Sequence, residues 1–549
     1  MNNNLFMIAV FWGVWIIIPV LFDGILTFIY MLTIVFHEKY HTIVKRDIAS
    51  KLKLYPETLP KVSVIIPTYN EEENINECLD YLKIQNYPQE KMEIIVVDNG
   101  STDETSNIVK KHMKEIWQLK QGNGNVVNGH TYEFGSFAGL LRLVVRYEKG
   151  KAKALNAGIR LAQGEIIINI DCRSFLAPDA IYNMVRKFVT QPEYGAVTGN
   201  VEIGWRLIYE RGLQGNYLLD QNGHYKPREL SRKEKFLAKS QFMEYLTSFR
   251  LGRQFQDITG SMFTFSGAFS AFRREVILHS SMYQSRTVAE DTDLTLNLQG
   301  QNVRLGFATD AKAYLKPVLS FERFYAQRIR WHRGQIEVIG LHLGWYGNLR
   351  KGFWRNLWLS TLLMIDHTFG FPRIIWLFLL PLFFLFGYST TLIIEAIFLM
   401  YAFYVLIDFL NAGYCYQVVD KEARKHIKNS IQYCFVTPFF RLLTFYFRFA
   451  GYLDTLKEPQ AWTTPINPVR SVKGSYQKTI NFGLKVWRFV SGQKSSPAVY
   501  YDEKIAELDN FGLENAKIQV SPQVSNGEID FKQKKMDGVF NEQKIKERG

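Results

Sequence analysis

The distribution of apolar residues divides the chain into a central domain and two membrane-like regions. Residues 5–36 are almost entirely apolar and exceed the ~20 residues that a helix needs to cross a bilayer. From residue 61 onward, short apolar runs alternate with amphipathic stretches, which predicts alternating strands and helices. Residues 374–388 and 391–410 are again apolar enough to span a membrane, whereas residues 490–549 are polar and predict a disordered tail.

Charged residues beside the apolar segments predict the orientation of the chain in a membrane. Five basic residues follow the first segment: Lys39, Lys45, Arg46, Lys51 and Lys53. By the positive-inside rule they place this flank, and the domain behind it, in the cytoplasm. A second basic group, at 421–428, predicts another cytoplasmic loop. Segments 357–371 and 431–450 are interrupted by charged residues or proline, so the number of C-terminal spans stays open.

The pattern inside the central domain is that of an α/β fold. Apolar runs predict strands at 62–66, 94–97, 141–145 and 166–170, with helices at 72–84, from 102 and at 151–163. This alternation predicts a parallel sheet with helices on its faces, and such sheets bind ligands beyond the carboxyl ends of their strands. Polar residues follow three of the strands, at 67–71, 98–103 and 171–174. One such run is typical of a strand-to-helix turn, but three at successive strand ends indicate a binding site.

A helix predicted from residue 321 carries a second group of polar residues. Gln327, Arg330 and Trp331 are spaced i, i+3 and i+4, so their side chains leave one face of the helix. A guanidinium can bind a pyrophosphate, and an indole offers a flat surface to a sugar ring. The other face carries an apolar stripe that a membrane surface or a domain core could cover: Phe321, Phe324, Tyr325, Ile329, Ile336 and Ile339. The alternative is an ordinary amphipathic helix with solvated arginines.

Composition narrows the classes of partner. The 549 residues are 47% hydrophobic, and the formal net charge is +14. A charge of this size suits nucleic acid, phosphate-bearing ligands or an anionic membrane surface. Because the basic residues lie beside apolar segments and no nucleic-acid motif is present, we expect a membrane and no nucleic acid. The four cysteines are widely spaced without a C-x-x-C pair, which predicts free thiols in a reducing compartment.

Several motifs resemble those of the family-2 glycosyltransferases. Residues 62–71 (VSVIIPTYNE), 97–103 (VDNGSTD) and 150–156 (GKAKALN) are similar to the nucleotide-sugar half of these enzymes. Residues 266–269 (SGAF), 272–274 (FRR), 290–291 (ED) and 327–331 (QRIRW) are similar to the acceptor half of the processive, membrane-embedded members. Those members include the cellulose, chitin, hyaluronan and poly-N-acetylglucosamine synthases. The resemblance implies an α/β domain of the GT-A (nucleotide-diphospho-sugar transferase) type, fused to a transmembrane helical region.

The resemblance also implies a role for each matching residue. Donor binding would use Pro67, Tyr69, Glu71 and Asp98 around the uridine, Lys151 and Asp171 near the phosphates, and Gln327 and Arg330 at the pyrophosphate. Asp291 would be the general base that takes the proton from the attacking hydroxyl, and Trp331 would hold the acceptor sugar. The alternative for Asp291 is a first-turn acid favoured by the helix dipole.

One position departs from the family pattern. The family usually has Asp-x-Asp where this chain has Asp171, Cys172 and Arg173, so a cation replaces the second carboxylate. A divalent ion prefers several oxygen ligands, so this change weakens or relocates the site. Three outcomes are open: Arg173 supplies the charge to the phosphates, Asp171 meets Mg2+ or Mn2+ together with donor oxygens and water, or the enzyme is impaired. We expect Mg2+ or Mn2+ at Asp171.

The expected organisation has six parts. They are an N-terminal transmembrane segment (1–37), a cytoplasmic GT-A domain (55–320), an amphipathic interface helix with the QxxRW motif (321–350), C-terminal transmembrane or interface helices (355–450), a candidate gating segment (451–489) and the polar tail (490–549). The gating segment rests on a loose similarity around Trp462, and a plain linker is its alternative. Two further stretches, at 121–136 and 204–229, predict polar loops without an assigned role.

The expected function is that of an inverting, multi-pass glycosyltransferase of the cell membrane. It would transfer sugar from a UDP-sugar to a growing β-linked polysaccharide, with coupled translocation of the product. Transfer to a lipid acceptor is a second hypothesis. A degenerate, non-catalytic partner that binds a sugar nucleotide is the third, because Arg173 replaces an expected carboxylate. The sugar, the linkage and any partner subunit are not predicted.

Overall fold

The structure is a computed structural model that describes ten stretches of the chain. They are residues 11–12, 20–44, 56–114, 129–136, 139–146, 149–204, 207–210, 226–342, 383–385 and 387–455. The predicted tail, Trp462, the segment 357–371 and most of the segment 374–388 lie outside these residues, as does the loop 211–225. The central domain and several flanking helices are described.

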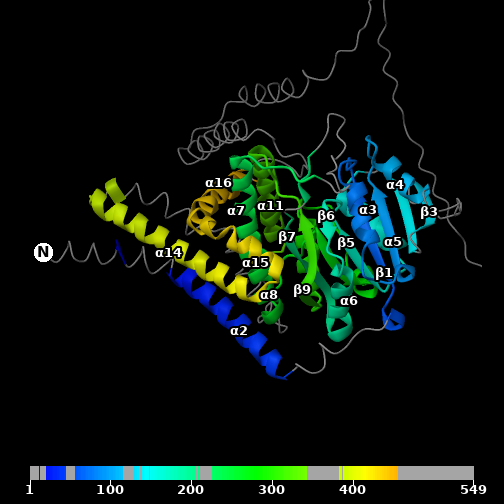
Figure 1. The fold of residues 1–549 in the computed structure, drawn as a ribbon, viewed down its shortest axis with the longest axis horizontal. Coiled ribbons are helices and arrows are strands. Elements are labelled where there is room, and N and C mark those ends of the chain that lie inside the picture. Colours follow the sequence, from blue (N-terminus) through cyan, green and yellow to red (C-terminus); the bar gives the residue numbers. More distant parts are fainter. Residues whose placement is uncertain are drawn as a thin grey trace, which may run out of the picture. The chain divides into compact units, whose positions relative to one another are not determined.

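A mixed β-sheet forms the centre of the domain (Figure 1). In the order in which they lie side by side, its strands are β3 (Gly129–Ser136), β4 (Gly139–Arg146), β2 (Met92–Asp98), β1 (Val62–Thr68), β5 (Ile166–Ile170), β8 (Phe269–Arg273), β7 (Tyr194–Ile203), β9 (Arg304–Leu315) and β6 (Ser174–Leu176). The predicted parallel arrangement holds for β4, β2, β1 and β5, and again for β7 with β9. It is wrong elsewhere, because β3, β6 and β8 run antiparallel to their neighbours. Residues 129–136, predicted as loop, form β3.

Helices cover both faces of the sheet because its strands are apolar on both sides. On β1, Val64 and Ile66 face one core with α3 (Ile75–Lys83), α4 (Thr105–Lys114) and α6 (Ala180–Thr190). Ile65 faces a second core with α5 (Lys151–Leu161) and α10 (Glu290–Gly300). Alternate residues of a strand point to opposite faces, so a continuous apolar run indicates a strand buried on both sides. The remaining short helix of this domain is α9 (Arg274–His279).

The helix that carries Gln327, Arg330 and Trp331 is α11 (Phe321–His342). Its apolar stripe packs against α16 (Thr437–Thr455), where Phe440 and Phe447 join the cluster, and against α7 (Arg232–Glu244). Two coverings were open for this stripe, a membrane surface or a protein core, and the structure supplies a protein core. Side-chain packing between helices thus fixes α11 against its neighbours.

Two long apolar helices flank the domain. Among the described residues, one helix is long and apolar enough to cross a membrane, α14 (Thr390–Val418). α2 (Leu26–Val44) exposes apolar side chains that include Phe28 and Phe36. The Tyr404 hydroxyl of α14 donates a hydrogen bond of 2.6 Å to Asp23, in the π-helix before α2. Asp23, which interrupts the first apolar segment, therefore joins the two apolar elements.

Short elements connect these helices to the sheet. α7 continues into a π-helix (Tyr245–Leu251, η5) and α8 (Gly252–Thr259), and Tyr30 of α2 stacks on Phe255 of α8 at 4.1 Å. α15 (Lys421–Lys428) follows α14, and Asp420 at its start pairs with Lys312 of β9. The basic group predicted at 421–428 therefore lies on a helix that contacts the domain.

Candidate active site

The loops after β1 and β2 are tied together. The pairing of the two strands sets Thr68 opposite Asp98, so both loops start at the same edge of the sheet. Asn70 has a left-handed backbone (φ 52°), and its N–H donates to the Ser101 hydroxyl at 2.9 Å. Asp98 is 1% exposed, and it accepts hydrogen bonds from the Ser101 N–H at 2.9 Å and from the Ser106 hydroxyl. Its carboxylate therefore shapes the loop.

Two other residues predicted at the uridine follow β1. Pro67 lies within β1 and is half-buried, and Tyr69 is 45% exposed at the start of the loop. The Lys149 ammonium lies 5.7 Å from the centre of the Tyr69 ring. An exposed ring beside a cation is a surface on which a flat base can stack.

Glu71 reaches from the end of β1 to the turn after β5. Its carboxylate accepts from Arg173 Nε at 2.8 and 3.1 Å and pairs with the same guanidinium through Nη2 at 2.8 Å. Asn74 Nδ2 donates to Glu71 Oε2 at 2.8 Å, and the Glu71 N–H donates to the Thr105 hydroxyl at 2.8 Å. The Arg173 side chain is 68% exposed, whereas that of Glu71 is 13% exposed. The cation of the unusual Asp171-Cys172-Arg173 turn thus lies at the open side of the strand ends.

Lys151 begins α5 and holds two carboxylates. Its Nζ lies 2.9 Å from Asp171 Oδ1 and 3.2 Å from Glu290 Oε1. Burial alone would lower the pKa of Lys151, but the charges of Asp171 and Glu290 outweigh burial and raise it. Burial raises the pKa of Glu290, and the neighbouring Asp291 adds to the increase while Lys151 opposes it. Lys151 is therefore a permanent positive charge at the carboxyl end of β5.

Asp291, in the first turn of α10, meets Lys151 at a glycine. The Gly267 N–H donates to Asp291 Oδ2 at 3.0 Å, and Asp291 Oδ1 accepts from the Thr292 N–H at 2.8 Å. A Cβ on Gly267 would lie 3.1 Å from Asp291 Oδ2 and 3.3 Å from Lys151 Nζ. Because Gly267 has no side chain, the Asp291 carboxylate and the Lys151 ammonium can both lie close to its backbone. The Asp171 N–H, which donates to the Ala268 carbonyl at 3.3 Å, fixes β5 to the same turn.

α11 packs on the segment just before Asp291. A Cβ on Gly334 would lie 2.6 Å from the Ala289 Cβ and 3.0 Å from the Ala289 nitrogen, so only glycine permits this contact. Trp331, one turn earlier on α11, packs edge-on against Phe249 with ring centroids 6.2 Å apart. α11 therefore contacts the segment before α10 through Gly334, one turn after Trp331. Gln327 and Arg330 are half-buried, and their side chains make no hydrogen bond or ion pair within the described residues.

A buried ion pair packs against the ring of Trp331. Arg328 donates to Glu244 through both terminal nitrogens, at 2.7 and 2.6 Å. The Arg328 guanidinium lies 4.6 Å from the Trp331 ring centre and 4.7 Å from that of Phe324. Glu244 is not among the predicted site residues, and its partner 84 positions away was not predicted. This is a tertiary contact between distant segments, so no local sequence pattern predicts it.

Arg253 is a second residue that the sequence does not single out. It is 4% exposed, and its Nη1 has no hydrogen-bond partner in the described part of the chain. Its guanidinium stacks on Phe249 at 4.8 Å. Burial lowers the pKa of Arg253 to about 10, and the charge of Asp291 opposes the decrease. Arg253 is therefore a buried cation held against Phe249, the residue that also packs on Trp331.

The turn formed by Asp171, Cys172 and Arg173 is poorly suited to bind a divalent cation. Within the described residues, no group of three or more His, Cys, Asp or Glu side chains is arranged to bind a metal. Asp171 faces the Lys151 ammonium, Cys172 is buried, and Arg173 is a cation. Mg2+ and Mn2+ prefer several oxygen ligands, and this turn supplies one carboxylate.

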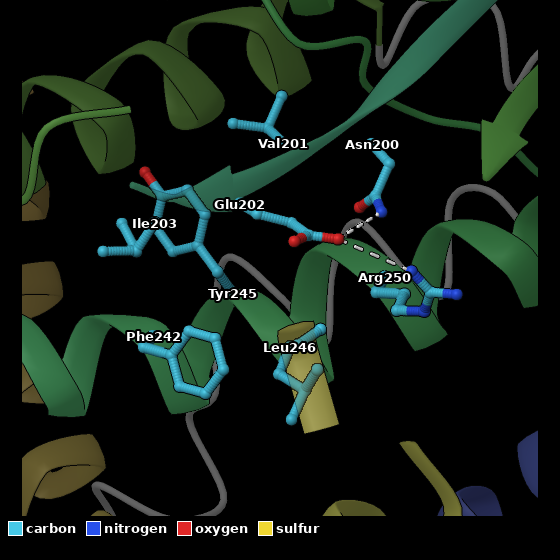
Figure 2. A pocket seen from close by; sticks show the side chains of 9 residues that line it. Asn200, Val201, Glu202, Ile203, Phe242, Tyr245, Leu246 and Arg250 are labelled. Carbon is cyan, nitrogen blue, oxygen red and sulfur yellow. Dashed lines mark hydrogen bonds and ion pairs between the residues drawn. The ribbon is translucent and has the colours of Figure 1, made fainter. Parts of the chain in front are cut away.

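A small cavity beside β7 is lined by none of these residues (Figure 2). Glu202 points into it, where it accepts from Asn200 Nδ2 at 2.8 Å and pairs with Arg250 at 3.6 Å. Phe242 and Leu246 line the apolar side. The ion pair occupies the polar side of the cavity and links η5 to β7, so we assign it to structure.

The mixed sheet, with acids and cations at its strand ends, agrees with the GT-A fold expected for a family-2 glycosyltransferase domain. The family model of glycosyl transferase family 2 matches residues 63–279, and that of glycosyl transferase family group 2 matches residues 227–406. The chain therefore contains a family-2 glycosyltransferase domain, and the resemblance of its motifs is confirmed.

Curated relatives share the central part of the chain. The poly-beta-1,6-N-acetyl-D-glucosamine synthase of Staphylococcus aureus is 24% identical over 296 residues, which are 54% of this chain and 60% of the relative. That of Staphylococcus epidermidis is 24% identical over 343 residues, 62% of this chain and 68% of the relative. The chain thus spans about three fifths of the length of the Staphylococcus aureus relatives.

Solved structures align at lower similarity. A mannosyltransferase from Pyrobaculum calidifontis in complex with GDP-mannose and Mn2+ has a TM-score of 0.43 and 18% identity, covering 78% of this chain and 99% of that one. The S. aureus protein TarS, residues 1–349 with UDP-GlcNAc, has a TM-score of 0.31 and 16% identity, covering 51% and 66%.

Proposed function

We propose that the chain transfers a sugar from a UDP-sugar to the hydroxyl of a growing β-linked glycan, with inversion at the anomeric carbon. The observation that carries the proposal is the meeting of Asp291 with Lys151 at Gly267, beside the carboxyl end of β5. One carboxylate and one fixed cation are the groups that such a transfer requires. The family-2 domain supports the reaction class.

In the proposed reaction the acceptor oxygen attacks the anomeric carbon of the donor. A carbon–oxygen bond forms to the acceptor as the bond to the β-phosphate oxygen breaks, and UDP leaves with the electron pair. Asp291 takes the hydroxyl proton, and its hydrogen bonds from Gly267 and Thr292 hold the carboxylate in place. Lys151 supplies positive charge near the leaving diphosphate, with Gln327 and Arg330 of α11 as further contacts.

The other predicted residues fit roles around this centre. Tyr69 offers an exposed ring for the uracil, beside Pro67, while Asp98 and Glu71 order the loops that surround it. Trp331 is the proposed platform for the acceptor sugar, because Arg328 and Phe249 fix its ring on α11, one turn before the contact of Gly334 with Ala289. The Mg2+ or Mn2+ expected at Asp171 is left out of the mechanism, because the turn supplies one carboxylate oxygen donor beside two cations.

We further propose that the product is a polysaccharide and that the protein is a multi-pass membrane protein with a cytoplasmic catalytic domain. The names of the relatives support a polymer and make UDP-N-acetylglucosamine the first donor to test. The apolar helix α14, the exposed apolar side chains of α2 and the basic residues after each support membrane insertion. Translocation of the product through these helices belongs to the same proposal.

The test is an assay of purified protein in detergent with a panel of UDP-sugars. We expect UDP release with at least one donor and a product larger than one added sugar. Asp291→Asn is expected to lower the rate about 100-fold or more, because the base is lost. Asp310→Asn is the matched control, because Asp310 is an exposed carboxylate paired with Arg186 outside the site.

Equal rates for the wild type and Asp291→Asn would remove the catalytic role of this residue. A labelled product of one sugar on lipid would replace the polymer with a glycolipid. Binding of UDP without release from any donor would favour the non-catalytic hypothesis.

A further inference from the structure

The cations at the strand ends differ in how far they are already neutralised. Lys151 holds two carboxylates, at 2.9 and 3.2 Å, and a quarter of its side chain is exposed. Arg173 has one carboxylate partner, Glu71, and is 68% exposed. Of these two groups, Arg173 is the more accessible to an incoming anion and the less neutralised.

The turn after β5 directs Arg173 outward. The Ser174 N–H donates to the Asp171 carbonyl at 2.8 Å, which closes the turn. Cys172 is 3% exposed and packs in the core, so the residues on either side of it leave the sheet edge. Asp171 turns to Lys151, and Arg173 turns to the loop after β1. The guanidinium therefore joins the turn after β5 to the loop after β1, at the strand ends where we propose that the nucleotide binds.

The contact with Glu71 is one that a diphosphate can displace. The Arg173 side of this ion pair is exposed, and screening of that charge by water weakens the pair. A guanidinium fork matches two phosphate oxygens, and its hydrogen bonds to phosphate are stronger than those between neutral groups. Glu71 keeps other partners when Arg173 leaves, since Asn74 Nδ2 donates to it at 2.8 Å and Thr105 holds its backbone. After release of Arg173, the Glu71 carboxylate, which is 13% exposed, thus keeps the hydrogen bond from Asn74.

We propose that Arg173 is a donor-binding residue that leaves Glu71 to bind the diphosphate of the UDP-sugar, so that UDP binding does not require a divalent cation. This inference rests on the proposed function and deepens it. Asp171 then serves as the ion-pair partner of Lys151. The guanidinium of Arg173 supplies the positive charge that a divalent cation would otherwise bring to the diphosphate. The poor fit of the turn to Mg2+ or Mn2+ follows from the same geometry.

Titration calorimetry of the full chain in detergent tests the proposal, with UDP and uridine as probes, in EDTA and in Mn2+. We expect the UDP Kd of the wild type to change less than about threefold between the two conditions. Arg173→Gln is expected to weaken UDP binding about tenfold or more, because charge-assisted hydrogen bonds are lost, and to leave uridine binding unchanged. Arg186→Gln, at an arginine with one carboxylate partner outside the site, should bind UDP like the wild type.

A second variant keeps the test decisive. Arg173→Asp places a second carboxylate two positions after Asp171, so its UDP binding should be weak in EDTA and improve in Mn2+. Loss of wild-type binding in EDTA would overturn the inference, as would a UDP Kd of Arg173→Gln equal to that of the wild type; both leave the proposed function standing. A folded wild type, with an intact thermal transition, that binds no UDP under either condition would overturn both. Equal melting temperatures of the variants would show that the differences arise from binding.

Discussion

The ion pair between Glu244 and Arg328 gives a stability prediction that can be worked from the structure. Arg328 is 4% exposed and donates two hydrogen bonds, at 2.7 and 2.6 Å, to a carboxylate that is 16% exposed. Its Nε has no hydrogen-bond partner within the described residues. In Glu244→Gln the guanidinium stays buried between Trp331 and Phe324 but loses the opposing charge and one of its two acceptors.

Removal of one partner from a buried pair costs about 3–5 kcal/mol, because the remaining charge is left uncompensated. The glutamine keeps one acceptor oxygen, so we expect about 3 kcal/mol, the lower end of this range. Thermal unfolding followed by circular dichroism in detergent should then show a melting temperature lower by about 5 °C or more. Asp310→Asn breaks the exposed pair with Arg186 and serves as the control, at less than about 1 kcal/mol. Equal melting temperatures for the two variants would refute the role of Glu244.

Two further predictions concern the packing of α10 and α11. Asp293 accepts from Arg286 and His342; burial alone would raise its pKa, but these hydrogen bonds lower it. A lowered pKa means that the stabilisation by this carboxylate is fully present above its unfolded pKa of about 4 and is lost progressively as the pH falls from that value through the lower pKa of the folded state. The melting temperature of Asp293→Asn should therefore fall well below that of the wild type at pH 7 and approach it below about pH 4; a constant gap would contradict this. Gly334→Val should lower UDP release, because its Cβ would lie 2.6 Å from the Ala289 Cβ, just before α10, whereas Gly340→Ala meets nothing within 4 Å and should retain activity; equal losses in the two would exclude a specific contact.

The sequence predicted best those parts of the fold that repeat locally. The strands β1, β2 and β5 lie where apolar runs indicated them, and α10 and α11 begin at the predicted residues. The direction of β8 was not predictable, because a strand of five apolar and polar residues pairs equally well with either orientation of its neighbour. β3 was missed because it follows a Gly- and Asn-rich stretch that predicts a loop.

The sequence predicted individual residues of the candidate site, and the structure adds the contacts between them. Lys151, Asp171 and Asp291 came from separate motifs, and the fold places them around Gly267. The pair of Arg173 with Glu71 joins positions 102 residues apart, and it exists because parallel pairing of β1 with β5 sets their ends side by side. Such pairs depend on tertiary contacts, so a one-dimensional pattern does not contain them.

The account depends most on the strand ends being the place where the nucleotide binds. A structure of the full chain with UDP tests this directly. We predict the uracil against Tyr69 and the diphosphate between Lys151 and Arg173, with the guanidinium of Arg173 moved off Glu71. UDP bound elsewhere, for example beside Arg250 in the cavity at β7, would contradict the account.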